Sequence, residues 1–558
     1  MESERYDVVC IGAGGAGVTA AVTAARRGAK VAIVSKEPIG YGNTRIAVGA
    51  MSCTGMAPAD SVQTFVSDII TGGEEIGNVD LAEAAAVDAP AAVALLESFG
   101  YFFKRDGEGR LSERAAFRTA GHSIARSASG ARPGMAIGAA LRAAAASAPL
   151  TILEDTVACR LLVQDGRVVG VVCLHLPSGE PRALSAKAVL LATGGLGWLY
   201  YPHTDCMRSC TGDGYALAYW AGAELVDMEQ VQFIPFGITH PSSMVGIFCG
   251  EPAHAGDGVL LNRHGRVVLT GLDRMTRAQV AKTICFEVLN GGGTEHGGLL
   301  LDLSPNYASG RTARLRQLQE DGGMLDTIRA AYGERAAKWE EPWDVAPTAH
   351  FHMGGVLVDD EGRSTVPGLY AAGEAQGGLH GGNRLGSVAL TEIFVFGRRA
   401  GEAMARDAAA TRWSPPDPAL VAAEVAHVDS LYGRNGSRRP VALARRLQDT
   451  LWQKAGPVRD ESGLAAAARQ IESLREEAAD LRTSPSHRYN PEALDAVELE
   501  FMLTVAGIVV RCALERQESR GAHVRLDFPN RDDERWLRNI VVRQEAGQMA
   551  VTTREVRR

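Results

Sequence analysis

A glycine pattern near the N-terminus restricts the fold more than any other feature of the chain. G-x-G-x-x-G begins at Gly12, between a strand-like segment at residues 6–12 (YDVVCIG) and an Ala-rich helical segment at residues 16–27. A second strand-like segment, AKVAIVS, follows at residues 29–35. Glycines at these spacings allow a tight turn and let a pyrophosphate reach the backbone N–H groups at the helix N-terminus. The segment therefore predicts a βαβ unit that binds a dinucleotide.

The length and composition indicate several globular domains. A chain of 558 residues is too long for one compact core. With 46% hydrophobic and 22% charged residues, it can bury large cores and is not expected to be disordered. The formal net charge of -8 gives no basic footprint. We therefore expect no nucleic acid partner.

The cysteines and the apolar stretches indicate whether the protein binds a metal and where in the cell it is located. The nine cysteines are scattered, and Cys206 and Cys210 lack the repeated short spacing of a zinc or iron-sulfur site, so no metal site is predicted. The N-terminus shows no basic region followed by an apolar segment, as a secretory signal would. The apolar stretch at residues 499–514 is interrupted by Glu500 and Arg511 and is shorter than the roughly 18 residues that span a bilayer. We expect a cytoplasmic protein with reduced thiols and no direct membrane insertion.

Changes of pattern along the chain indicate its domain organisation. Strand-like segments at residues 187–191 and 368–374 are separated by a stretch in which glycine and charge content rise, and helical spacing dominates from about residue 417. The predicted fold class is α/β. We expect a Rossmann-type nucleotide domain in two segments (1–237 and 346–412), an inserted α+β domain (238–345), a C-terminal helical domain (417–515) and a C-terminal segment (516–558).

Three further segments favour FAD over NAD as the dinucleotide. ATGG closes a strand at residues 192–195, TGDG follows at residues 211–214, and Gly373 and Glu374 lie in the late strand that returns to the first domain. NAD enzymes do not need this return, whereas flavoproteins with two dinucleotide-binding domains have it. Glu374 is then a candidate for contact with the ribitol or ribose.

The acidic residue expected on the adenosine ribose is displaced. In this motif it ends the second strand, but here the strand ends in Ser35 and Lys36, and Glu37 comes one or two places later. Two placements of Lys36 stay open: near the phosphates or the adenine edge, or facing solvent.

Five motifs fall in the order of one flavoprotein family. They are YGNTRIAVGAMS (41–52), QFIPFG (232–237), PTAHFHMGG (347–355), GGNRLGSVAL (381–390) and ESRGAHVRLDFPNRDDERWL (518–537). Through them the chain resembles, over nearly its whole length, the succinate dehydrogenase and fumarate reductase flavoproteins, a family that includes L-aspartate oxidase and adenylylsulfate reductase. The resemblance implies an FAD domain in two segments, a mobile capping domain, a helical domain and a small C-terminal segment.

The resemblance also implies the cofactor contacts. The family often attaches FAD covalently to a histidine in a Ser-His-Thr segment, but the matching residues here are Gly42, Asn43 and Thr44. Because an asparagine cannot form that bond, we expect noncovalent FAD. The cofactor contacts carried over are Gly12, Gly14, Gly15, Ala16, Gly17, Ser35, Lys36, Gly42, Asn43, Thr44, Gly49, Ala158, Ala192, Thr193, Gly194, Asp213, Gly373, Glu374, Arg384, Ser387 and Val388.

For catalysis, the resemblance places Arg384 and His350 at a substrate carboxylate beside the flavin. Arginine offers a planar fork for a carboxylate, and polarising that group makes the neighbouring carbon a better hydride acceptor. Arg277 matches the family's proton-donating arginine, with Arg274 as the alternative. An arginine can act as an acid only when a neighbouring acid resupplies its proton, and Glu251 is the candidate for this relay.

The second carboxylate clamp of the family is missing. Its His-Pro-Thr-Gly motif reads IPFG at residues 234–237, so Ile234 and Phe236 replace the polar groups. Gly250 replaces a threonine, and His254 stands at an arginine position. A distal carboxylate facing Ile234 and Phe236 would be an unpaired buried charge, which costs several kcal/mol. We therefore expect a substrate other than succinate or fumarate, with His254 or His122 as a replacement polar contact.

These observations predict an FAD-dependent oxidoreductase that transfers a hydride between flavin N5 and a carbon next to a carboxylate. Arg277 would exchange a proton with the neighbouring carbon. Two alternatives remain open: an amino-acid oxidase resembling L-aspartate oxidase, and the flavoprotein subunit of an electron-transfer complex. The expected partners are a small carboxylic acid and, for the second alternative, an iron-sulfur or other electron-transfer protein.

Overall fold

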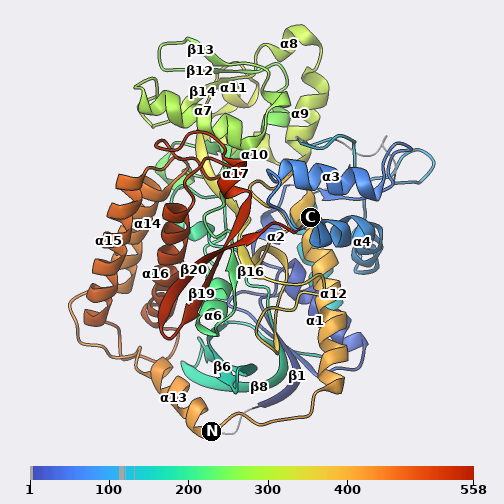
Figure 1. Ribbon diagram of the computed structural model, residues 1–558. Helices are drawn as coiled ribbons and strands as arrows, with labels where there is room; N and C mark the ends of the chain where they lie inside the picture. The colour runs from blue at the N-terminus through green and yellow to red at the C-terminus, as the bar shows by residue number, and fades with distance from the viewer. Residues whose placement is uncertain (1–3, 49, 112–117, 120, 131, 558) are drawn as a thin grey trace.

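The largest sheet of the protein carries the predicted βαβ unit. The computed structural model describes residues 4–48, 50–111, 118–119, 121–130 and 132–557. The strands of this sheet, in spatial order, are β5 (Leu150–Leu153), β2 (Val31–Val34), β1 (Glu4–Ile11), β8 (Glu180–Leu191), β7 (Arg167–His175) and β6 (Thr156–Gln164). β1 pairs in parallel with β2 and β8, whereas β6 and β7 form an antiparallel extension. The sheet lies at the lower end of the molecule in Figure 1.

Helix α1 (Gly15–Arg26) connects β1 to β2, as the sequence pattern predicts. The four residues of β2 and the last four of β1 are buried. Because both faces of these strands are covered, their sequences are continuously apolar and do not alternate between polar and apolar residues. On α1 ten residues are buried, most of them alanine, valine or glycine. Small side chains allow the helix to lie close to the sheet on one side and to another helix on the other.

A late segment of the chain completes this domain. Strand β17 (Leu369–Ala371) pairs in parallel with β8, and helix α12 (Val388–Ala410) packs along α1, beside which it runs in Figure 1. Gly397 and Gly401 lie directly against the backbone of α1, where a Cβ at either glycine would approach a backbone oxygen to 2.7 Å or less. The nucleotide domain is therefore built from two segments of the chain, as predicted.

The insertion forms a sheet of its own with a separate hydrophobic core. Its strands, in spatial order, are β11 (Phe248–Gly250), β10 (Val231–Ile238), β15 (Trp343–His352), β14 (Leu299–Asp302), β12 (Val259–Leu261) and β13 (Val267–Leu269). Its helices are α7 (Arg277–Leu289), α8 (Asn306–Ser309), α9 (Thr312–Asp321), α10 (Met324–Tyr332) and α11 (Glu334–Ala337). This capping domain lies at the upper end in Figure 1. Strands β10 and β15 extend beyond the range 238–345 expected for it, because both strands enter the sheet from the nucleotide domain.

Four helices follow in the predicted helical region, namely α13 (Pro418–Asp429), α14 (Pro440–Ala455), α15 (Glu461–Glu477) and α16 (Pro491–Glu515). Their buried residues share one hydrophobic cluster with strands β6 to β8. The C-terminal segment adds α17 (Asp533–Trp536) and the strands β19 (Arg538–Glu545) and β20 (Gln548–Glu555) to a sheet with β18 (Gln376–Gly377), β16 (Gly355–Leu357) and β9 (Leu225–Val226). The C-terminal part thus contacts the nucleotide domain through a shared hydrophobic cluster and a shared sheet.

The remaining elements surround the N-terminal unit. They are α2 (Asn43–Ile46), β3 (Met51–Ser52), α3 (Val62–Gly72), α4 (Val79–Ser98), β4 (Ser127–Ala128), α5 (Pro133–Ala146) and α6 (Asp213–Trp220). Among the described residues, no helix combines the length and the apolar character that crossing a bilayer requires.

Candidate functional site

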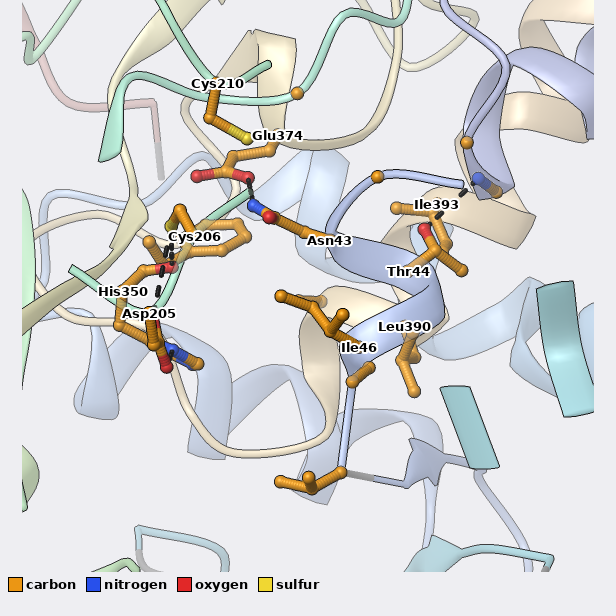
Figure 2. Close-up of a pocket in the computed structure, with 18 of the residues that line it drawn as sticks. Asn43, Thr44, Ile46, Asp205, Cys206, Cys210, His350, Glu374, Leu390 and Ile393 are labelled. Carbon is orange, nitrogen blue, oxygen red and sulfur yellow. Dashed lines mark hydrogen bonds and ion pairs between the residues drawn. The ribbon is translucent and has the colours of Figure 1, made fainter. Parts of the chain in front are cut away.

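One large cavity joins the nucleotide domain to the capping domain. Its volume is about 770 Å³, which lies in the upper part of the range of about 300–1,000 Å³ typical of ligand sites. At one end it is lined by the N-terminus of α1 and the end of β2, and at the other by β11, α7 and the loop before α12. Figure 2 shows the part of its wall that carries α2.

Most of the residues predicted for the cofactor line this cavity. They are Gly12, Gly14, Gly15, Ala16, Ser35, Lys36, Gly42, Asn43, Thr44, Ala158, Ala192, Thr193, Gly194, Asp213, Gly373, Glu374, Arg384 and Ser387. Gly17 and Val388 lie outside its wall, and Gly49 lies outside the described residues. The predicted catalytic residues Glu251, His254, Arg277 and His350 also line the cavity.

The glycines at the start of α1 have different physical roles. A Cβ on Gly17 would lie 2.0 Å from the carbonyl oxygen of Gly12, so no side chain fits between helix and strand. A Cβ on Gly14 would meet nothing closer than 3.6 Å. Gly14 therefore leaves space on the cavity side, where the N-terminus of a helix with free N–H groups suits a pyrophosphate. The residues present fit a dinucleotide at this end.

Lys36 lines the cavity and is held there by two carboxylates. Its ammonium lies 2.9 Å from a carboxylate oxygen of Asp213 and 2.9 Å from one of Glu498 on α16, and its side chain is only 13% exposed. Burial would lower the pKa of Lys36, but the two carboxylates raise it above its ordinary value. Lys36 therefore fastens the helical domain to the edge of the cavity.

At the middle of the cavity, Asn43 on α2 points toward Glu374, as Figure 2 shows. The Asn43 amide donates to Glu374 Oε2 over 3.4 Å and accepts the backbone N–H of Met207 at 2.9 Å. The backbone N–H of His352 donates to Glu374 Oε1 at 3.0 Å. Burial raises the pKa of Glu374 to about 7. The residue at the family's covalent attachment position is thus held by hydrogen bonds within the protein.

Two buried guanidinium groups meet at the capping-domain end of the cavity. Nη1 of Arg277 and Nε of Arg384 both donate to the amide oxygen of Gln232, at 3.2 and 3.3 Å. The Gln232 amide nitrogen donates in turn to Asn383 Oδ1 and to the Arg384 carbonyl oxygen, at 3.0 and 2.9 Å. Gln232 therefore fixes the positions of both arginines.

The two arginines differ in their charge partners. Arg277 forms an ion pair of 2.5 Å with Glu251. Within the described part of the chain, Arg384 has no ion-pair partner and instead lies over the ring of Phe351, with 4.8 Å from Cζ to the ring centroid. Burial, with Arg277 as the next cause, lowers the pKa of Arg384 to about 9. Arg384 is thus a buried cation without a direct carboxylate partner in the described part of the chain, and an anionic ligand would provide one.

Glu251 stays ionised beside these cations. Burial acts to raise the pKa of Glu251, but the attraction of Arg277 and then of His254 outweighs it and lowers the pKa to about 2. Burial also lowers the pKa of His254, against the attraction of Glu251. Nδ1 of His254 is buried and has no hydrogen-bond partner among the described residues. His254 therefore lines the cavity, but its unpaired Nδ1 is buried within the protein.

His350 is held from behind by a carboxylate. Its Nδ1 lies 2.8 Å from Asp205 Oδ2, and the two side chains face each other in Figure 2. Burial lowers the pKa of His350, whereas Asp205 opposes the shift. Because Nδ1 is occupied, Nε2 is the nitrogen left for a ligand. The ring of Phe248 stacks beside His350, with 6.4 Å between centroids.

The structure corrects the expected orientation of the residues at the missing clamp. Ile234 and Phe236 are fully buried in β10, a strand covered by α7, and neither lines the cavity. Phe236 packs in the capping-domain core, and a Cβ on Gly250 would lie 3.7 Å from its ring. Phe236 and Gly250 are paired on adjacent strands, and the two residues at the missing clamp serve as core packing.

Two further predicted residues lie outside the cavity. Nε2 of His122 lies 2.9 Å from the Gly386 carbonyl oxygen and Nδ1 lies 3.2 Å from Arg126, so the ring is occupied on both sides. Arg274 is exposed on the capping domain and does not line the cavity. Of the two arginines considered as proton donors, only Arg277 lies in the cavity.

Comparison with known proteins gives these contacts a family context. The model of the FAD binding domain matches residues 7–390, and that of the fumarate reductase flavoprotein C-terminal region matches residues 444–558. A protein of Methanothermobacter marburgensis that is named as a subunit of fumarate reductase (CoM/CoB) is 36% identical over 557 residues, covering 98% of both chains. The chain belongs to the fumarate reductase and succinate dehydrogenase flavoprotein family. FAD is accordingly its cofactor, and it is an FAD-dependent oxidoreductase.

Solved structures of the family agree with this fold. Sdh1 of Mycobacterium smegmatis in complex with UQ1 superposes with a TM-score of 0.89 at 32% identity, covering 100% of this chain and 95% of the other. The fumarate reductase flavoprotein subunit of Mycobacterium tuberculosis is 34% identical over 588 residues, covering 97% of this chain and 95% of its own length. The resemblance predicted from the motifs, the fold class and the cofactor are thus confirmed.

Three residues that hold the site in place escaped prediction. Gln232 stands at the start of a motif that the sequence does single out, but only its hydrogen bonds reveal that it joins two arginines. Asp205 and Glu498 belong to segments without any motif. Their roles depend on contacts between residues far apart in the chain, for which one sequence carries no pattern.

Proposed function

We propose that this flavoprotein catalyses hydride transfer to or from a carbon next to the carboxylate of a small organic acid, and that Arg384 binds this carboxylate. The single observation that carries the proposal is the buried guanidinium of Arg384, which lies near Arg277 and forms no ion pair with any described residue. An ionised carboxylate accepts two parallel N–H bonds from such a fork. FAD, when bound, supplies the hydride chemistry.

The proton would be handled by Arg277. Its ion pair with Glu251 provides the acidic neighbour that an arginine needs to recover a proton, and the two side chains are only 6% and 15% exposed. His350, held by Asp205, would orient the carboxylate or its neighbouring carbon through Nε2. Three side chains from two domains would then fix one substrate, so movement of the capping domain would assemble or open the site.

The substrate proposed is a carboxylic acid with an apolar distal part. The positions of the family's second clamp are packed inside the capping domain, whereas Val245, Ile247 and Phe248 line the cavity near His350. A second carboxylate beside these apolar side chains would lose its hydration without gaining a partner from them. His254 also lines the cavity and is the candidate for a polar contact to a distal group.

We also propose that the flavin is bound noncovalently, because Asn43 has no nucleophilic nitrogen and its amide is already engaged by Glu374 and Met207. Acid precipitation of the enzyme should release the flavin into the supernatant. Flavin that stays in the protein pellet would contradict this.

A second role follows from the relatives. The Methanothermobacter marburgensis relative and the succinate dehydrogenase flavoprotein of Rickettsia bellii are both named as subunits. We propose that this chain also works with an electron-transfer partner such as an iron-sulfur protein. Copurification of such a protein with the tagged chain from its native host would support this, and a tagged chain that is recovered alone with full activity toward a soluble electron donor would contradict it.

The substrate proposal is tested with the photoreduced enzyme and a panel of unsaturated acids. Crotonate and cinnamate carry one carboxylate, whereas fumarate carries two. We expect cinnamate or crotonate to reoxidise the flavin at least about tenfold faster than fumarate, since a lost charge partner costs more than about 1.4 kcal/mol. Faster reoxidation by fumarate would overturn the assigned substrate class. Formation of peroxide with an amino acid under air would instead support an oxidase.

A further inference from the structure

A second group of potential ligands lies in the capping domain, away from the cavity. His240, His296 and Asp344 each offer a ligand atom, and these atoms lie within 4.8 Å of one another. The three residues come from the end of β10, from the loop between α7 and β14, and from the start of β15. Because they are far apart in the chain, their spacing forms no motif that the sequence alone reveals.

One carboxylate oxygen of this group is left without a partner. Asp344 is only 7% exposed, and its Oδ1 is buried with no hydrogen-bond partner among the described residues. A buried polar atom without a partner costs about 1–3 kcal/mol, and more when it is charged. A cation would satisfy this oxygen.

The surroundings also prepare His240 as a ligand. Its Nδ1 lies 3.1 Å from Thr239 Oγ1, and this hydroxyl donates to the Asp344 carbonyl oxygen at 3.2 Å. Nδ1–H of His240 therefore donates to Thr239, and Nε2 keeps a free lone pair. An outer hydrogen bond of this kind fixes the tautomer and orientation of a metal-bound histidine.

The second imidazole lies directly against the first. The rings of His240 and His296 are stacked with 4.0 Å between centroids and an angle of 29°. His296 is exposed, so it can turn to bring its nitrogen nearer. Zinc bonds of about 2.0–2.2 Å to nitrogen and oxygen in a tetrahedron place ligand atoms about 3.4 Å apart, which requires only a small contraction of the group.

We propose that His240, His296 and Asp344 bind one divalent transition-metal ion of the zinc class, with water completing the coordination. Two imidazoles and a carboxylate form a ligand set that zinc accepts. The ion would join the ends of β10 and β15 to the loop before β14. It would thereby stabilise one end of the capping-domain sheet, where β10 ends and β15 begins, without taking part in the flavin site.

The experiment uses the FAD-loaded enzyme after treatment with a chelator. Zinc sulfate is titrated by calorimetry into the wild type, into His296→Ala, and into His264→Ala as a matched control. His264 is also an exposed histidine of the capping domain, but it lies outside the group. We expect one zinc ion per chain for wild type and control, and at least about 100-fold weaker binding for His296→Ala.

Cobalt(II) distinguishes this site from the cysteines. The wild type should give d–d bands without a thiolate charge-transfer band, and these bands should disappear in Asp344→Asn, a variant that keeps the size of the side chain. The proposal is overturned if the wild type shows no saturable zinc site, if His296→Ala binds as tightly as wild type, or if the cobalt spectrum shows thiolate ligation.

Discussion

The two ends of the cavity are built in different ways. At the nucleotide end, backbone groups and small residues shape the wall, as Gly14 shows, and Gly17 behind the wall lets α1 lie close to β1. At the end that we propose for the substrate, long charged side chains shape the wall, and Gln232 orients Arg277 and Arg384. The first kind of wall depends on the absence of side chains and tolerates little change. The second can change its specificity through single residues while the fold persists.

The largest effect should come from Gly17→Ala at the nucleotide end. Its new Cβ would lie 2.0 Å from the Gly12 carbonyl oxygen, and overpacking of this kind costs about 1–3 kcal/mol or more. We expect a lower melting temperature and loss of most of the bound FAD. Gly14→Ala is the matched control: the apoprotein should melt at the wild-type temperature, and only FAD affinity should fall. Equal melting temperatures for both apoproteins would contradict the difference between the two glycines.

At the substrate end, Glu251→Gln should reduce kcat by about 100-fold, equivalent to ~2.7 kcal/mol. The variant removes the charge that pairs with Arg277 but keeps the shape of the side chain. Steady-state kinetics with the preferred acid measures the effect. A change confined to KM would mean that Glu251 serves binding rather than proton transfer.

A smaller effect is expected for Gln232→Leu, which removes the acceptor shared by both arginines. Loss of this positioning residue should raise KM for the carboxylate by about tenfold. Each hydrogen bond to a charged group contributes about 1.5–3 kcal/mol, and the substrate carboxylate would replace part of this lost free energy when it binds the arginines. Gln232→Glu is the informative comparison. Its carboxylate would neutralise the arginines and should weaken anion binding further while retaining FAD.

The smallest effect concerns pH. Only the protonated guanidinium of Arg384 binds a carboxylate, and its pKa is lowered to about 9 by burial and by Arg277. KM should therefore be constant from pH 7 to 8.5 and rise above pH 9, by at most about tenfold per pH unit. Glu251 has a pKa of about 2, so it should not produce an acid limb near pH 4. A KM that stays flat to pH 10.5 would exclude Arg384 as the titrating group.

The same contrast explains how much could be predicted from the sequence. The βαβ unit and the return of β17 were predictable, because glycine spacing and apolar runs reflect backbone geometry. The cavity also brings together Arg277, Glu251 and Arg384, as their motifs indicated. The orientation of Phe236 was not predictable, since a motif gives a residue's identity but not the face of the strand on which it packs.

Long-range ion pairs were also beyond the sequence. Lys36 follows a nucleotide-binding strand, so its position suggested the phosphates, the adenine edge or solvent. Its true partners include Glu498, which lies on a helix of another domain. The packing of the domains determines which carboxylate pairs with Lys36. A single sequence does not indicate this packing.

The role of Arg384 is tested most directly by the binding of a monocarboxylate to the oxidised enzyme, followed through the flavin absorbance, in wild type and Arg384→Ala. Both proteins must carry equal FAD, and Arg274→Ala, which changes an exposed arginine of the capping domain, serves as control. We predict saturable spectral changes with crotonate or cinnamate in wild type and control, and at least about 100-fold weaker binding in Arg384→Ala, since a charged hydrogen-bonded pair is lost. Unchanged affinity in Arg384→Ala would contradict the assignment of this arginine as the carboxylate-binding group.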